Sequence, residues 1–376
     1  MSARLPQLEM LRGLAALFVL LDHLPKILPL PDGLLAVPLF VPAWWTGVDL
    51  FFALSGFVVV RALRSDADVR GAPRAVVEFA VRRAFRLWPT ALLVVAAACV
   101  FAYAVDRHAP GSSGPLVLRE AWWSLTGAAN LRGWLCTVHE AGDCARAEIL
   151  GHMWSLALEH QFYLFAPAIL AFSRRAAATG LLLAFAVVVA IDRSGEGAWF
   201  FRPDAFVLGS VLALVDLERV RLRIDGYGAG RVFRIGLGAM LLAPVVVSAH
   251  SRSLAFLITG LGAAAVVAVT SCRPVPTGRA ARWFAALGGV SYSFYLWHLP
   301  VLNAWHEALS RFGAVPVTQA GWTLAAAGSL PLCIGAACVS HRLVERPFRR
   351  IGIGLARRIG DRIGRRRAPA TLEVGA

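Results

Sequence analysis

Two ionisable groups, eleven positions apart, interrupt an apolar segment near the start of the chain. Residues 11–24 read LRGLAALFVLLDHL, with Arg12 at one end and Asp22 and His23 at the other. A charge at the centre of a bilayer is costly, so an ionisable residue within a membrane span is a candidate functional group. A guanidinium binds phosphate, and an imidazole transfers protons or attacks carbonyl carbons. The segment therefore predicts chemistry inside a membrane.

Other apolar segments also contain polar residues. Glu159 lies near the middle of one of them, and the further members of this set are Asp49, Ser55, Arg202, Asp204, Tyr292, Tyr295 and His298. Each of these residues also has a purely structural explanation, in which its side chain only forms a hydrogen bond with a neighbouring buried group. Together they are too costly to be independent accidents. We expect them to converge on one hydrated cavity, in a transporter or in an enzyme.

The elements that hold these residues are predicted to be membrane helices. Of 376 residues, 58% are hydrophobic and 16% are charged, whereas a soluble domain has about 25% charged residues. Runs of about 20 apolar residues are long enough to span a bilayer as helices. The sequence predicts an all-α bundle of about ten transmembrane helices. The predicted spans are 8–28, 40–60, 88–105, 149–171, 178–192, 200–216, 233–248, 253–270, 286–306 and 320–341.

Arginine dominates the charge of the chain. The net charge is +15, and Lys26 is the single lysine. The arginine-rich connections follow the second, fourth, sixth and eighth predicted spans, on the side of the N-terminus. Because positively charged loops remain in the cytoplasm, both termini are predicted to be cytoplasmic.

The last residues differ from the predicted transmembrane domain, residues 1–348. In the segment 349–376 an apolar residue recurs every four positions among arginines, at Ile351, Leu355, Ile359 and Ile363. This spacing is typical of a basic amphipathic helix on an anionic leaflet. A disordered basic tail is the alternative.

The six cysteines do not have the spacing of a zinc site, and we expect no metal. Cys136 and Cys144 share a large loop predicted to be external, where an oxidising compartment permits a disulfide. We expect these two residues to be bridged.

The ordered motifs of the chain resemble the membrane-bound acyltransferase-3 family over nearly its whole length. The motifs are LRGLAALFVLLDH at 11–23, GVDLFFALSGF at 47–57, RRAFRLWP at 82–89, WSLALEHQFY at 154–163, RPDAFVLG at 202–209, SYSFYLWHLP at 291–300 and VERPF at 344–348. His160 stands where many family members have a second Glu, so it receives no role. The resemblance implies a multi-pass protein of the bacterial cytoplasmic membrane that O-acylates sugars.

The resemblance also implies a cytoplasmic acyl-CoA donor, most simply acetyl-CoA, used as a co-substrate with no bound cofactor. The arginines suited to its phosphates are Arg12, Arg82, Arg83 and Arg86. A role in membrane topology is the alternative for each, with equal weight for Arg82 and Arg83.

His23 is the expected centre of the reaction, with Glu159 orienting or charge-balancing its imidazole. His23 acts either as a general base on the acceptor hydroxyl or as an acylated intermediate. The other polar residues of the set are expected to line or support the acceptor path. They are Asp49, Ser55, Arg202, Asp204, Tyr292, Tyr295 and His298.

The sequence leaves more than one acceptor for the acyl group. A sugar of a cell-envelope glycan is the first expectation, and a secreted glycosylated metabolite such as a macrolide is the second. A proton-coupled transporter is the alternative from a different functional class. The expected partners are acyl-CoA, a carbohydrate acceptor and lipid, with no nucleic acid.

Overall fold

The computed structural model describes residues 6–28, 30–31, 42–104, 114–138, 148–191, 193, 195–248, 250–273 and 277–367. Within these ranges the chain forms helices and no strand, which confirms the all-α prediction. The longer helices are α1 (Pro6–Ile27), α2 (Gly47–Arg70), α3 (Ala72–Ala104), α7 (Arg174–Ala190), α12 (Arg252–Ser271), α14 (Ser291–Arg311), α15 (Gln319–Ser340) and α16 (Arg346–Arg367). The shorter helices are α4 (Gly114–Leu125), α5 (Ala129–Val138), α6 (Met153–Phe165), α8 (Asp204–Leu214), α9 (Leu217–Tyr227), α10 (Ala229–Leu241), α11 (Ala243–Val247) and α13 (Arg279–Gly289).

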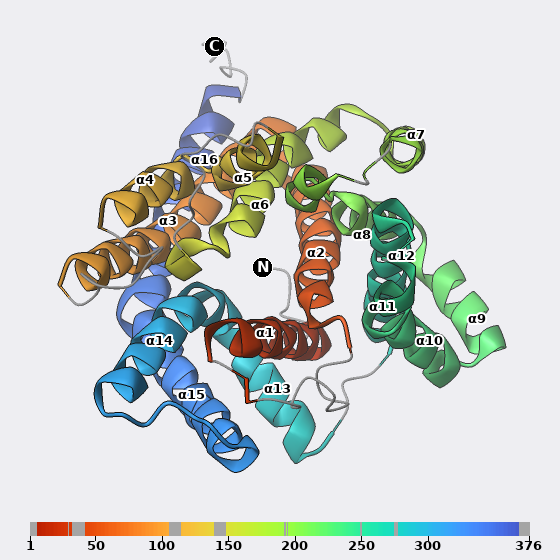
Figure 1. The fold of residues 1–376 in the computed structure, drawn as a ribbon. Coiled ribbons are helices and arrows are strands. Elements are labelled where there is room, and N and C mark those ends of the chain that lie inside the picture. Colours follow the sequence, from red (N-terminus) through yellow and green to blue (C-terminus); the bar gives the residue numbers. More distant parts are fainter. Residues whose placement is uncertain are drawn as a thin grey trace, which may run out of the picture.

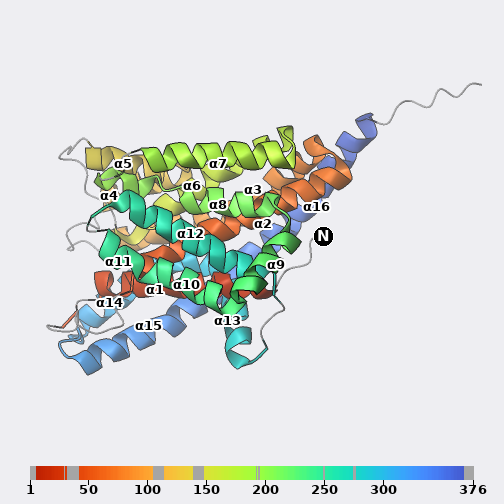
Figure 2. The ribbon, with the colours of Figure 1, turned by 90° about the vertical axis from the view of Figure 1, so that its right-hand side faces the viewer.

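The helices form one bundle. Helices α1, α2, α3, α6 and α14 surround its centre, while α7 and α9 lie at the periphery (Figure 1). In the side view α9, α13 and α16 occupy one end, and α4, α5 and α11 occupy the other (Figure 2). The arginine-rich segments α9, α13 and α16 thus share one end of the bundle. The side of the membrane that this end faces stays a prediction.

The spans are less regular than the hydropathy pattern predicts. Five helical segments in the described ranges are long and apolar enough to cross a membrane, or six if two helices that meet at 108° count as one. The fourth predicted span is the 13-residue α6 continued by a 3-10 helix, Ala166–Ala171. The ninth is broken at Val290, between α13 and α14. The predicted count of about ten spans therefore remains a prediction.

Glycine allows α2 and α8 to cross at very short distance. A Cβ atom on Gly56 of α2 would lie 2.3 Å from the Phe206 carbonyl oxygen of α8, and one on Gly209 of α8 would lie 2.1 Å from the Ala53 carbonyl oxygen of α2. Small residues let membrane helices approach to backbone contact. This crossing fixes the rotation of α2 and therefore the direction of Ser55, which follows Ala53 by two residues.

The Gly56 contact predicts a specific loss of stability. Gly56→Ala should lower the melting temperature of the purified protein, because overpacking a tight contact costs about 1–3 kcal/mol. Gly180→Ala is the matched control, since a Cβ atom on Gly180 of α7 meets nothing within 4 Å. Equal melting temperatures for the two variants would contradict the crossing.

The C-terminal helix packs against α3. A π-helical turn, His341–Glu345, joins α15 to α16, so the predicted domain boundary at residue 348 falls inside a continuous helical segment. A Cβ atom on Gly352 would lie 2.4 Å from the Phe85 side chain, and Arg74 of α3 bonds Asp361 of α16 at 2.7 Å. Residues 349–367 are thus helical, and residues 368–376 lie outside the described ranges.

Candidate functional site

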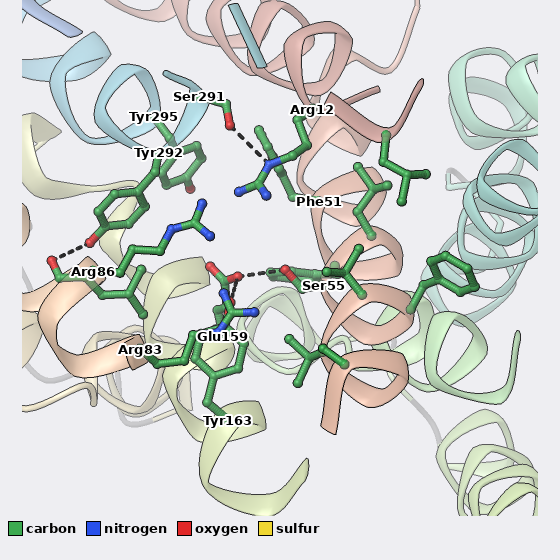
Figure 3. Close-up of a pocket in the computed structure, with 18 of the residues that line it drawn as sticks. Arg12, Phe51, Ser55, Arg83, Arg86, Glu159, Tyr163, Ser291, Tyr292 and Tyr295 are labelled. Carbon is green, nitrogen blue, oxygen red and sulfur yellow. Dashed lines mark hydrogen bonds between the residues drawn. The ribbon is translucent and has the colours of Figure 1, made fainter. Parts of the chain in front are cut away.

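A cavity of about 500 Å³ opens between α1, α2, α3, α6, α14 and the first turn of α16. Its walls combine aromatic and aliphatic side chains with a group of cations (Figure 3). The arginines that line it are Arg12, Arg61, Arg83, Arg86 and Arg349, whereas the acidic lining residues are Glu9 and Glu159. The excess of guanidinium groups favours an anionic ligand.

The cavity arginines come from different helices and have defined neighbours. Arg83 and Arg86 lie three residues apart on α3, so they share one face of the helix. The Arg83 guanidinium lies over the Tyr163 ring, 4.8 Å from its centroid. Arg12 Nε donates to Ser291 Oγ at 3.3 Å, where the break between α13 and α14 exposes the start of α14. Figure 3 shows the guanidinium groups of Arg12, Arg83 and Arg86 pointing into the same cavity.

Glu159 is the acceptor at the centre of this arrangement. The Ser55 hydroxyl donates to Glu159 Oε1 at 2.7 Å. Tyr163, one helical turn further along α6, donates to the same oxygen. Two hydroxyl donors fix the carboxylate opposite the arginines (Figure 3). Glu159 therefore partly balances their charge and leaves them room for a further anion.

Arg86 has a second buried carboxylate behind it. Glu345 is 2% exposed, and its Oε1 lies 3.9 Å from Arg86 Nε. Its Oε2 accepts from Ser293 Oγ at 2.8 Å and from His341 Nδ1 at 2.9 Å. Glu345 and His341 are the last and first residues of the π-helical turn, a geometry common at functional sites. Glu345 lies in the VERPF motif and was not among the predicted site residues. The signal that could have identified it is an acidic residue beside the last apolar span.

Removing the Glu345 carboxylate should destabilise the protein. Glu345→Leu leaves the Arg86 charge without its buried partner, which costs about 3–5 kcal/mol. Glu307→Leu is the control, because Glu307 pairs with the exposed Arg311 and such pairs contribute about 0–1 kcal/mol. Thermal unfolding in detergent compares the two, and a Glu345→Leu protein as stable as the control would refute this role.

The structure distributes the predicted site residues over four places. Those that line the cavity are Arg12, Ser55, Arg83, Arg86, Glu159, Tyr292 and Tyr295. Arg82 faces away from it and bonds Asp66 at 2.7 Å and Glu78 at 3.0 Å. Arg82 therefore belongs to the ion pairs that join α2 and α3.

Asp49, Arg202 and Asp204 form a separate polar group in the bundle interior. Arg202 is fully buried, lies 3.2 Å from Asp49 Oδ2 and is stacked on aromatic rings, the nearest being Trp199 at 4.2 Å. Asp204 accepts two hydrogen bonds from Arg193, at 2.6 and 3.0 Å. Each of the two buried arginines thus pairs with a carboxylate, although the three guanidinium nitrogens of Arg202 have no hydrogen-bond partner among the described residues.

His23 lies beyond the cavity wall. Because a carbonyl oxygen can only accept, His23 Nδ1 donates to Val19 O, at 2.8 Å, and Nε2 keeps its lone pair. The His23 ring centroid is 5.0 Å from that of His298, which in turn is 5.0 Å from that of His152. His152 was missed by the sequence analysis, although an ionisable residue two positions before the WSLALEHQFY motif was a signal.

The cysteine prediction falls partly outside the described residues. Cys136 is disulfide-bonded, whereas Cys99, Cys272, Cys333 and Cys338 are free. Cys144 lies outside the described ranges, so its pairing with Cys136 stays a prediction. Within those ranges no three His, Cys, Asp or Glu side chains are placed to hold one metal ion.

Comparison with known families assigns the chain to one of them. Residues 5–340 match the acyltransferase 3 family, which is described as an acyltransferase domain. The chain belongs to this family. The resemblance inferred from the ordered motifs is thereby confirmed.

Two curated relatives illustrate the family. The chain is 28% identical over 346 residues to the "Putative membrane-bound transacylase BcsY" of Komagataeibacter xylinus, a match that covers 82% of this chain and 78% of the relative. It is 22% identical over 388 residues to the O-acetyltransferase OatA of Staphylococcus aureus strain NCTC 8325, covering 93% of this chain. The chain spans 58% of the length of that relative. No solved structure matches the chain.

Proposed function

We propose that this protein is a membrane acyltransferase that moves a short acyl group, in the first instance acetyl, from cytoplasmic acyl-CoA to a sugar hydroxyl of a cell-envelope glycan. The observation that carries this proposal is the arginine-lined cavity with Glu159 at its centre. The donor is strongly anionic, and arginine binds phosphate oxygens in bidentate fashion. The transferase class is further supported by membership of the acyltransferase 3 family.

The cavity has the order of groups that such a donor requires. Arg61 and Arg349 lie toward the arginine-rich end of α2 and α16, while Phe51, Ser155 and Tyr295 lie at the opposite end of the lining. Along α2, Phe51 precedes Arg61 by ten residues, or about 15 Å of helix. We therefore place the phosphates of the donor among the arginines and its thioester toward Tyr295.

His23 is the proposed reacting group beyond Tyr295. Its side chain is 21% exposed, in contrast to the fully buried His298, so an acceptor hydroxyl has access to it. The reaction breaks the thioester C–S bond and forms an ester C–O bond with the sugar. Glu159, held by Ser55 and Tyr163 in the donor cavity, is proposed to order the arginines around the donor.

The direct test uses the purified full-length protein and acetyl-CoA. We expect release of CoA thiol above the protein-free rate, and loss of acetyl esters from the envelope glycans of a deletion strain, detected by mass spectrometry. Acetyl loss confined to a secreted glycoside would replace the glycan by the alternative acceptor. A protein that releases no thiol from acetyl-CoA would refute the acyltransferase proposal.

His23→Ala should abolish acyl transfer. Because His23 is the only proposed group that contacts the acyl carbon, its loss should lower kcat on the order of 100-fold or more, with unchanged amounts of protein in the membrane. Thiol release measures the effect, and His250→Ala, which changes an exposed histidine outside the site, is the control. Normal turnover by His23→Ala would exclude both proposed roles of His23.

The arginines at the mouth should recognise phosphate. Arg349→Gln and Arg61→Gln should each raise KM for acetyl-CoA by about tenfold, because a hydrogen bond to a charged group contributes about 1.5–3 kcal/mol. With acetyl-pantetheine, which has no phosphate, the same variants should match the unmodified protein. Arg231→Gln, in an exposed position on α10, is the control, and an equal rise in KM for both donors would contradict the assignment.

A further inference from the structure

Two imidazoles, of His298 and His152, lie in a row between the predicted reacting histidine, His23, and the donor cavity. Ring centroids are 5.0 Å apart for His23 and His298, 5.0 Å for His298 and His152, and 5.4 Å for His152 and Tyr295. His298 is 0% exposed and His152 is 1% exposed. The row therefore runs through the protein interior, from the partly exposed His23 to the wall that Tyr295 contributes to the cavity.

The nitrogens of this row are poorly satisfied. His298 Nδ1 donates to the Tyr295 carbonyl at 2.5 Å, which leaves its Nε2 with a lone pair. Neither that nitrogen nor either ring nitrogen of His152 has a hydrogen-bond partner among the described residues. A buried polar atom without a partner costs about 1–3 kcal/mol. Three such atoms in one place call for an explanation in function.

The row ends at two hydroxyl groups on the cavity wall. Ser155 Oγ and Tyr295 Oη are hydrogen-bonded to each other, and both line the cavity. One of the two donates to the other, and the hydroxyl that accepts can donate to the His152 carbonyl oxygen, which lies 3.1 Å from Ser155 Oγ and 3.0 Å from Tyr295 Oη. The imidazole rings and the Tyr295 ring thus follow one another from His23 to the space proposed for the donor, at centroid distances of 5.0–5.5 Å and with no hydrogen bond from ring to ring among the described residues.

The hydrogen bond of His23 Nδ1 determines which nitrogen of its imidazole can react. With Nδ1–H held by the Val19 carbonyl, His23 has one free nucleophilic nitrogen, Nε2. For Nε2 to attack, the thioester must extend past Tyr295 to His23, which lies beyond the cavity lining. The C–S bond then breaks, a C–N bond forms, and CoA leaves as a thiolate toward the arginine-lined cavity. The acyl-imidazolium then has no free nitrogen with which to accept the proton of the incoming hydroxyl. A second base is required.

We infer that His298 is that general base, and that His152 carries the proton onward to the cavity; this inference rests on the proposed acyltransferase function. When the acceptor oxygen attacks the acyl carbon, the C–N bond breaks, a C–O bond forms and neutral His23 is restored. His298 Nε2 takes the hydroxyl proton. The proton passes to His152, then to the Tyr295–Ser155 hydroxyl pair, and finally to the CoA thiolate. The products are the ester and the free thiol, so atoms and charge balance.

The inference predicts an acyl-enzyme that accumulates when the second base is missing. The full-length His298→Gln protein, mixed with acetyl-CoA and chitotetraose as acceptor, should release one burst of thiol and then turn over on the order of 100-fold more slowly than the unmodified protein. Acid quenching and mass spectrometry should find the acetyl group on the peptide that contains His23. His160→Gln, which changes a histidine of α6 outside the row, should turn over normally.

A second variant separates this role from a structural one. His152→Gln should show the same burst and acetyl-His23, and the double variant should be no slower than either single variant, because groups in one path are not additive. Losses that multiply, or slow turnover without acetyl-His23, would overturn the inference while leaving the transferase activity in place. If the unmodified protein released no thiol from acetyl-CoA, the proposed function itself would fail. Should His298→Gln not fold, the burst and acetyl-His23 of His152→Gln decide the question.

Discussion

The structure depends on keeping several guanidinium groups charged in the interior of an apolar bundle. An unpaired buried charge is prohibitive, whereas one with a carboxylate and hydrogen bonds is tolerated. Glu159 faces the cavity arginines, Glu345 lies behind Arg86, and Tyr163 and Ser291 supply further contacts. The compensation of the arginine charges is incomplete, because more guanidinium than carboxylate groups line the cavity. An anionic donor completes it, and this links the stability of the bundle to its proposed function.

The irregular helices follow from the same constraint. The break at Val290 places Ser291 at the start of α14, within reach of Arg12. The π-helical turn brings His341 and Glu345 to the same side, where both meet near Arg86. His341 and Glu345 are four residues apart, a spacing that also places two side chains on one face of a regular helix. The Gly56 contact contributes through a regular helix and not through a break. It packs α2 closely against α8, and in this position Ser55 faces Glu159.

Much of the fold could be predicted from sequence, because apolar runs and arginine placement report on membrane burial. The polar residues within those runs could be identified from the sequence. Which of them line the cavity and which pair elsewhere in the bundle could not be predicted. Arg202 and Asp204 look in the sequence like Arg12 and Glu159, yet they are compensated by Asp49 and Arg193 away from the cavity. That outcome depends on the rotation of each helix, which hydropathy does not encode. His152 was missed for a related reason, since its significance comes from contacts with α14 and not from its own segment.

The central claim is that the arginine cavity holds the donor with its thioester directed toward Tyr295 and the three histidines. The most direct measurement is a cryo-electron microscopy structure with a non-hydrolysable thioether analogue of acetyl-CoA. The account predicts phosphate oxygens within hydrogen-bonding distance of Arg83 and Arg86, and the acyl end beside Tyr295. An analogue bound at the opposite end of the bundle, near α4 and α5, or bound with its phosphates outside the arginine cavity, would contradict it.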